Sequence, residues 1–347
     1  MATMTQTPAS VTVGVDTHGD VHVAAVLDEL GRLLGTISVP ATGAGYERIR
    51  RYAQSFGEIQ AVGIEGTGAY GAGLARHLRE RGIRVIEVDR PDRKTRRSRG
   101  KSDPIDAEAA ARAVLSGAAR GTPKSRDGTV EMIRTLRVCR RSASGARTQC
   151  MNQMHSLVST APEVLRAELR DLSPRELVQR TAAFRPGGVG TPTSATKLAL
   201  RELAHRYRFL TEQLRRLDGE LKPLVAKAAP RLMAINGIGT QIAGQLLVSA
   251  GDNPERLRSE SAFAHLCGVA PVPASSGKIT RHRLNRAGDR AANYALWRVV
   301  MVRLTSDDRT KAYMARRRSE GLSKREVIRC LKRYVAREVY RSLVDER

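Results

Sequence analysis

The chain has 347 residues, 41% of them hydrophobic, which is enough to bury cores in two or three domains. No apolar run reaches membrane-spanning length and the N-terminus lacks a signal-peptide core, so we expect a soluble, cytoplasmic protein with no membrane partner. The net charge of +25 favours a polyanion, and no amphipathic membrane helix or lipidation motif supports the alternative of an acidic membrane surface.

The first 120 residues or so predict an α/β domain. Three runs rich in Val and Ile within residues 11–40 are typical of strands separated by short turns. Helical and strand patterns then alternate, with a helix near 43–56, a strand at 59–66, a helix at 70–82, a strand at 84–89 and a helix at 104–117. This order predicts a mixed sheet, in which an antiparallel meander comes first and crossover units follow.

Residues 127–230 are almost entirely helical in pattern. Apolar residues from Leu203 to Leu224 alternate spacings of four and three, which is an a/d seam of about three heptads. Two interpretations stay open: a helix that packs inside its own chain, and a coiled coil that joins protomers. The segment 183–195 is rich in Gly and Pro and is the best linker candidate.

Residues 231–250 read as a helix, a Gly-Ile-Gly turn and a helix, which resembles a helix-hairpin-helix. In that motif glycines, here Gly237 and Gly239, let backbone N–H groups approach a phosphate beside a helix N-terminus. An ordinary helical hairpin is the alternative, and the basic character of the chain favours phosphate. The remaining residues, to 347, are predicted to be helices around a serine-containing loop.

Two residue types limit the chemistry further. The four cysteines, at 139, 150, 267 and 330, are far apart, which argues against structural zinc and against a disulfide framework. Only 4% of the residues are aromatic, so platforms for base stacking are scarce. We therefore expect contacts to the nucleic-acid backbone, which do not by themselves give sequence specificity.

Four carboxylates are the candidate catalytic groups. Asp16 lies inside the first strand, where a charge is costly to bury without compensation, and Glu65 ends a later strand. If these strands are neighbours, both carboxylates project at one end of the sheet. Asp103 and Asp106 lie three residues apart at a helix start and so share one face. For this pair a capping interpretation stays open, with Asp103 as the N-cap and Asp106 as the capping-box acid.

Four carboxylates at one sheet end repel one another unless divalent cations lie between them. Oxygen ligands suit Mg²⁺, with Mn²⁺ as the alternative, and two such ions can activate the attacking oxygen and stabilise the leaving oxygen in phosphodiester chemistry. The basic segment 90–101 precedes Asp103 and offers an approach for a phosphate backbone. Its expected contact residues are Arg93, Lys94, Arg96, Arg97, Arg99 and Lys101.

Four motifs in this order resemble a known family. "VGVDTH", "GIEGTG" and "KSDPIDA" resemble the three acidic motifs of the DEDD transposases, and "SSGKITRHRLNRAGD" resembles the Ser-Gly and Lys-Arg-Gly-Asn region of their C-terminal domain. The chain is thus similar to the insertion-sequence group called IS-one-ten, which is related to the Piv-type DNA invertases. Each motif alone is weak, but together they are quite specific and cover nearly the whole chain.

The resemblance implies a fold and a set of site residues. It implies a RuvC-like, RNase-H-type domain at 10–125, a helical coiled-coil region at 126–228 and a mostly helical transposase domain at 229–347. Asp16, Glu65, Asp103 and Asp106 match the metal-binding acids, and Ser276 matches the nucleophile, with Ser275 as the fallback. The expected phosphate contacts near the serine are Lys278, Arg281, Arg283 and Arg286, with Gly277 giving the backbone freedom. The turn 285–289 departs from the commoner Arg and Asn at Ala287 and Asp289.

The resemblance also implies a mechanism and partners. The serine attacks a phosphodiester and forms a covalent phosphoserine link, while a structured bridge RNA pairs with donor and target DNA. The helical middle joins protomers into a dimer or tetramer. Two other functions stay open: a RuvC-like nuclease or junction resolvase that uses metal and water, and a non-catalytic nucleic-acid-binding protein whose acids are caps and turn formers.

Overall fold

The structure is a computed structural model that describes residues 10–88, 102–274 and 282–345. The chain forms two compact units. The first comprises Met1–Gly128 and Ala250–Ser259, and the second comprises Thr129–Ser249 and Glu260–Arg347. Within the described ranges, no helix is both long and apolar enough to cross a membrane.

A five-stranded sheet forms the centre of the first unit. Its strands are β1 (Ser10–Thr17), β2 (Val21–Leu27), β3 (Leu33–Pro40), β4 (Glu58–Glu65) and β5 (Val85–Val88), in the order β3-β2-β1-β4-β5. The first three strands pair antiparallel, whereas β4 pairs parallel with both β1 and β5. The predicted mixed sheet, with a meander first and crossover units after it, is therefore confirmed.

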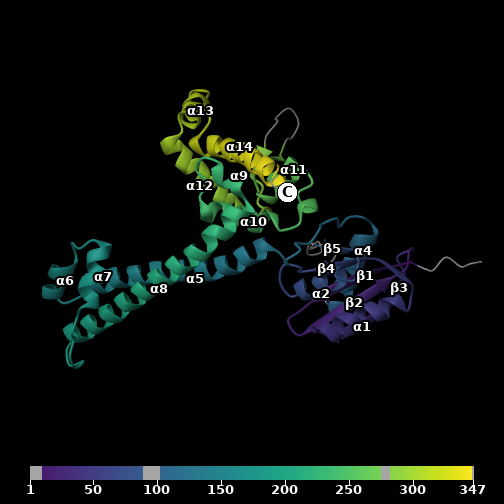
Figure 1. Ribbon diagram of the computed structural model, residues 1–347, viewed down its shortest axis with the longest axis horizontal. Helices are drawn as coiled ribbons and strands as arrows, with labels where there is room; N and C mark the ends of the chain where they lie inside the picture. The colour runs from purple at the N-terminus through teal and green to yellow at the C-terminus, as the bar shows by residue number, and fades with distance from the viewer. Residues whose placement is uncertain (1–9, 89–101, 275–281, 346–347) are drawn as a thin grey trace, which may run out of the picture. The chain divides into compact units, whose positions relative to one another are not determined.

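Helices cover both faces of this sheet (Figure 1). On one face, α1 (Gly43–Gln54) and α2 (Ala72–Arg79) pack against Val13 and Val15 of β1 in the main apolar core. On the other face lies α4 (Asp103–Leu115), which contacts Val23 and Ala25 of β2 through Ala107. Side chains alternate between the faces along each strand, and this alternation decides which residues can meet α4.

Two glycines let α4 lie directly on the strands. Gly14 of β1 pairs with Gly63 of β4, so they are side by side on the α4 face. A Cβ atom at Gly14 would lie 2.1 Å from the Ala107 carbonyl oxygen, and one at Gly63 would lie 3.0 Å from the Ala110 carbonyl oxygen. The helix backbone thus touches the strand backbone, which fixes the first turn of α4 at the end of β1.

The segment 250–259 returns to the first unit from far along the chain. It contains a short 3₁₀ helix, η1 (Pro254–Arg256). The Asn253 side chain donates to the Pro123 carbonyl at 3.1 Å and accepts from the Ser125 backbone N–H at 3.2 Å, and Arg256 donates to the Thr122 carbonyl at 3.0 Å. These bonds tie the segment to residues 122–125.

The second unit begins with two long helices, α5 (Thr129–Ser159) and α8 (Pro192–Ala228), which lie side by side and antiparallel (Figure 1). Two short helices, α6 (Glu163–Leu169) and α7 (Pro174–Ala182), pack where α5 ends and α8 begins. Leu210 and Leu214 of the predicted seam pack against Ala143 and Cys150 of α5. These two seam residues therefore pack inside their own chain, and a coiled coil between protomers stays a prediction.

The rest of the second unit is mostly helical, as expected. Its helices are α9 (Pro230–Ala234), α10 (Thr240–Ala250), α11 (Glu260–Leu266), α12 (Arg290–Ser306), α13 (Asp308–Ser319) and α14 (Lys324–Asp345). Two short strands, β6 (Val272–Pro273) and β7 (His282–Arg283), pair antiparallel. They flank the segment 275–281, which lies outside the described residues.

Candidate active site

The carboxyl ends of β1 and β4 bring the first two predicted acids to one edge of the sheet. Because these strands are parallel neighbours with Val15 opposite Ile64, their ends lie together. Asp16 follows Gly14 by two residues and Glu65 follows Gly63 by two, so both belong to the α4 side. The Thr17 hydroxyl donates to the Glu65 backbone oxygen at 2.8 Å and ties the two strand ends.

A row of polar side-chain contacts holds the loop that follows Glu65. Gly66 has a φ of +73°, a conformation that favours glycine, and turns the chain away from β4. Thr67 is buried and its hydroxyl donates to Glu87 at 2.6 Å, while the guanidinium of Arg256 lies 3.7 Å from the same carboxylate. The strand end that carries Glu65 is therefore braced by β5 and by the returning segment.

The helix start that carries Asp103 and Asp106 does not have the capping arrangement considered above. The N-cap is Ser102, whose side chain makes no capping hydrogen bond, so Asp103 is the first helical residue and Ile105 the third. Asp106 is therefore in the fourth position and cannot close a capping box with Ser102. It is 5% exposed, among residues of α4 that face the sheet. The capping interpretation of this pair is wrong.

A three-residue group lies where β1 meets α4. The Nε2 atom of His18 is 3.2 Å from Asp16 Oδ2 and 3.4 Å from Asp103 Oδ1, and one ligand atom from each residue lies within 4.8 Å of the others. The Asp16 side chain is 11% exposed, whereas those of His18 and Asp103 are each 49% exposed. The group thus combines the nearly buried carboxylate of Asp16 with two side chains, His18 and Asp103, that solvent can reach.

The donor set of this group fits a divalent cation. A nearly buried carboxylate such as Asp16 needs a compensating positive charge, and two carboxylates with one imidazole can bind a metal ion. Carboxylates suit Mg²⁺ and Mn²⁺, and an imidazole shifts the preference away from Mg²⁺. Glu65 and Asp106 lie on the same side of the sheet but outside this three-residue group.

Sequence reasoning missed His18. The signal was present, because His18 follows Asp16 by two residues at the end of a strand and so belongs to the same side. The six basic residues predicted within 90–101 lie outside the described residues, as do Ser275, Ser276, Gly277, Lys278 and Arg281. Arg283 and Arg286 are described and exposed.

The turn at 285–289 orients the start of α12. The Asn285 side chain accepts from the Ala287 backbone N–H at 3.0 Å, and a Cβ at Gly288 would lie 2.2 Å from the Gly268 backbone nitrogen. Asp289 is the N-cap of α12, with its side chain accepting from two backbone N–H groups of the first turn. Asp caps a helix as well as the Asn that is commoner in the family, so position 289 still has a capping residue.

A basic cleft of about 1160 Å³ lies among α5, α8, α10 and α12. Its cationic lining consists of Arg134, Arg137, Arg140, Arg141, Lys222, Arg290 and Arg298. Arg137 donates to the Gln241 carbonyl at 2.7 Å and to the Gln245 side chain at 3.0 Å, which holds its guanidinium still. Burial and the neighbouring arginines lower the pKa of Arg137 to about 10.

The two glycines of the predicted hairpin have different surroundings. Gly237 has a φ of +83°, and a Cβ there would lie 3.3 Å from Val299 of α12, so this glycine is required by the turn and its packing. Gly239 lines the basic cleft beside Thr240, the first residue of α10. Backbone N–H groups at this helix start therefore border the arginine-lined space.

Comparisons with known proteins match the two regions of the chain that contain the acidic and C-terminal motifs. The model of the DEDD transposases of the IS110 type, described as a transposase, matches residues 13–161, and that of the "Transposase IS116/IS110/IS902 family" matches residues 229–315. The chain is 30% identical over 226 residues to the transposase for insertion sequence element IS1328 of Yersinia enterocolitica, covering 62% of this chain and 63% of that protein.

Two further relatives are proteins of insertion elements. An uncharacterized 43.6 kDa protein of IS110 from Streptomyces coelicolor is 26% identical over 132 residues, covering 37% of this chain and 32% of that protein. An uncharacterized 42 kDa protein of IS900 from Mycobacterium paratuberculosis is 26% identical over 103 residues, covering 29% and 26%. The matches to these three relatives span less than two thirds of each relative's length.

Proposed function

Because the chain belongs to the IS110 family of transposases, we propose that it cuts and rejoins DNA during the transposition of an insertion sequence. The observation that carries this proposal is the meeting of Asp16, His18 and Asp103 at the carboxyl end of β1. The mixed sheet, with helices on both faces, supports a RuvC-like catalytic domain at 10–125.

In this proposal Asp16, Glu65, Asp103 and Asp106 hold Mg²⁺ or Mn²⁺. The metal, when bound, lowers the pKa of an attacking hydroxyl and stabilises the leaving oxygen. Asp16 is the ligand with the least freedom to move. It is buried near the end of β1, and Gly14 of the same strand packs against α4. His18 contacts both Asp16 and Asp103, so it keeps the strand carboxylate and the helix carboxylate in position or adds a nitrogen ligand.

Ser276 is the proposed nucleophile, with Ser275 as the alternative. Its hydroxyl oxygen attacks the phosphorus and loses its proton to solvent, while the bond to one sugar oxygen breaks and that oxygen takes up a proton. A sugar hydroxyl of the second strand then attacks the phosphoserine and releases the serine. The charge on the phosphate is stabilised by Lys278, Arg281, Arg283 and Arg286.

Nucleic acids are the proposed partners. The arginine-lined cleft supports backbone binding of DNA, and a structured bridge RNA is proposed to choose the donor and target sites. The remaining proposed regions are the helical middle at 126–228 and the transposase domain at 229–347. A dimer or tetramer, in which the serine of one protomer completes the acidic site of another, is proposed as the active form.

A covalent adduct tests the serine chemistry. Ser276→Ala and Ser275→Ala are each incubated with donor DNA, the RNA transcribed from beside the gene and Mg²⁺, then denatured and probed for a protein–DNA band. We expect the wild type and Ser275→Ala to form the band and Ser276→Ala to lose it.

Each other outcome identifies a different function. Loss of the band only in Ser275→Ala moves the nucleophile one residue back. Metal-dependent cleavage without any covalent band would mean that the protein is a nuclease in which water is the nucleophile. A protein that binds nucleic acid and never cleaves it is the non-catalytic alternative.

A further inference from the structure

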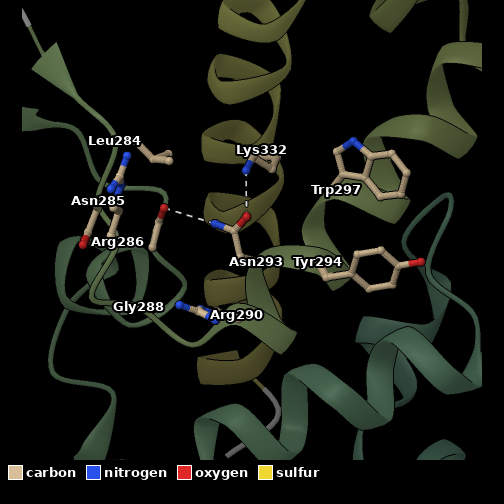
Figure 2. Close-up of a pocket in the computed structure, with 10 residues that line it drawn as sticks. Leu284, Asn285, Arg286, Gly288, Arg290, Asn293, Tyr294, Trp297 and Lys332 are labelled. Atoms are coloured by element: carbon tan, nitrogen blue, oxygen red, sulfur yellow. Dashed lines mark hydrogen bonds between the residues drawn. The ribbon is translucent and has the colours of Figure 1, made fainter. Parts of the chain in front are cut away.

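A pocket of about 550 Å³ lies in the second unit and is lined by residues of α12 and α14 (Figure 2). This volume falls in the range of small-ligand sites. Its cationic lining is Arg286, Arg290 and Lys332, and no carboxylate is among the described residues that line it. A pocket with three cations and no acid is built for an anionic group.

Lys332 is the unusual member of this lining. It is 9% exposed, and its ammonium donates to the Asn293 side-chain oxygen at 2.8 Å. The Asn293 amide nitrogen donates in turn to the backbone oxygens of Cys267 and Gly268, at 2.8 and 3.1 Å, which turns the amide oxygen toward the lysine (Figure 2). Among the described residues no carboxylate pairs with Lys332, so its charge is met by a neutral amide alone.

The same pocket contains the chain's only tryptophan. Trp297 and Tyr294 lie one turn apart on α12, with ring centroids 5.5 Å apart and planes 27° from parallel. Tyr294 is 60% exposed, and both rings line the pocket (Figure 2). An aromatic pair on a helix surface is often only packing. Here it lies within a cationic lining, the combination by which proteins bind unpaired bases and their phosphates.

The pocket connects two other hollows of the second unit. Arg290 and Tyr294 also line the basic cleft among α5, α8, α10 and α12. Lys332 also lines a hollow of about 650 Å³ that includes His282 and Arg283, next in sequence to the segment 275–281. The three hollows therefore adjoin one another, from the arginine-lined cleft to His282 and Arg283.

We propose that this pocket binds one unpaired nucleotide of a nucleic-acid strand that follows the three hollows. The base stacks on the exposed ring of Tyr294, which itself stacks on Trp297, and the phosphate binds Lys332 and Arg290. The inference relies on the proposed function only for the partner being nucleic acid; the acidic group and the serine chemistry play no part in it.

The single tryptophan makes the test direct, because any fluorescence change at its emission maximum reports on Trp297. The full-length protein is titrated with ten-nucleotide oligo(dT), oligo(rU) and a ten-base-pair duplex. We expect saturable quenching by the single strands and none by the duplex. The stronger of the two single-strand arms identifies the bound strand as DNA or RNA.

Two variants assign the contacts. Tyr294→Leu should weaken single-strand binding about 5- to 150-fold, the range expected for one lost stacking partner. Lys332→Met should weaken it and lower the slope of log affinity against log salt by about 0.7, as for one lost phosphate contact. The matched controls are Tyr70→Leu, a tyrosine of similar exposure in the first unit, and Lys311→Met, a half-exposed lysine paired with Asp308. Both should leave quenching unchanged.

Each contrary result has a separate meaning. A labelled single strand that binds by anisotropy without changing the Trp297 emission overturns the pocket and leaves the proposed function standing. Equal quenching by the duplex overturns the unpaired nucleotide. Failure to bind any nucleic acid overturns both proposals. If Lys332→Met does not fold, as judged by circular dichroism, the single-strand affinity of Tyr294→Leu still tests the proposal.

Discussion

The two units bury charge of opposite sign, and the two cases differ in cost. In the first unit Asp16 is an almost buried carboxylate that lies 3.2 Å from the His18 imidazole in the three-residue group. In the second unit Lys332 is an almost buried ammonium near Arg329, and both the burial and this neighbour lower its pKa. Asp16 can share a cation with the two other members of its group, whereas Lys332 donates to a neutral amide.

This difference identifies the more informative residue. Surface arginines are compatible with solvent and say little about any one contact. A buried lysine that faces a neutral amide loses hydration without gaining a carboxylate, and such an arrangement is costly unless an anion completes it. In the two proposals, the acidic group binds a divalent cation and the pocket at Lys332 binds one phosphate of a polyanion.

The largest effect is expected at the acidic group. Asp16→Asn keeps the shape of the buried side chain and removes its charge. A residue that only orients a ligand typically costs about 10–100-fold when it is lost, and DNA cleavage by Asp16→Asn should fall by more than this. Retained single-strand binding would show that the second unit is intact. Asp20→Asn, an exposed acid of the neighbouring turn, is the control and should keep full activity.

His18→Ala should lose about 10–100-fold in cleavage. If the imidazole is a ligand, the loss should be greater with Mn²⁺ than with Mg²⁺, because nitrogen ligands favour Mn²⁺ over Mg²⁺. Cleavage assays with each metal, together with Mn²⁺ titration by electron paramagnetic resonance, measure this. Full activity of His18→Ala with both metals would remove His18 from the site.

A smaller effect is expected from separating α4 from the sheet. Gly14→Ala places a methyl group where the Ala107 carbonyl oxygen and the Ala111 backbone nitrogen lie, at 2.1 and 2.2 Å. Overpacking of this kind costs about 1–3 kcal/mol in the free energy of unfolding. Denaturant unfolding of the first unit measures it, with Gly43→Ala as the control, since no atom lies within 4 Å of a Cβ there. Equal stability of the two variants would mean that α4 is not seated on β1.

Local patterns were enough to predict the first sheet. Alternating Val and Ile runs with short turns predicted the order of elements along the chain and the antiparallel meander. The sequence left open whether the strands of Asp16 and Glu65 are neighbours, and the pairing of β1 with β4 shows that they are. The capping interpretation failed because the helix begins at Asp103, so Ser102 is the N-cap. Element ends are set by a single hydrogen bond and are the hardest feature to read from sequence.

The second site depends on contacts that sequence patterns do not encode. Lys332 lies in a run of Lys and Arg that reads as a solvated helix face, and only the packing of α12 against α14 buries it. The 4% aromatic content predicted few stacking platforms, and this average hid the pairing of Tyr294 with Trp297. Asn253 joins residues about 130 positions away, which no local period can reveal.

The smallest effect sharpens the contrast between the two buried charges. Burial lowers the pKa of Lys332 below its ordinary value of 10.5 in the folded protein, while the unfolded chain keeps the ordinary value. Between these two values the unfolded state binds more protons, so the wild type gains stability as pH rises through this window. Below the window the lysine is charged in both states and its burial cost is fully present. We therefore expect the free energy of unfolding of the wild type, relative to Lys332→Met, to increase as the pH rises toward 10.5. Chemical denaturation at several pH values measures this difference, and Lys311→Met should track the wild type because Lys311 is half-exposed and paired with Asp308. A difference that falls with pH would mean that a carboxylate stabilises the charged lysine, and the requirement for a phosphate in the pocket would disappear.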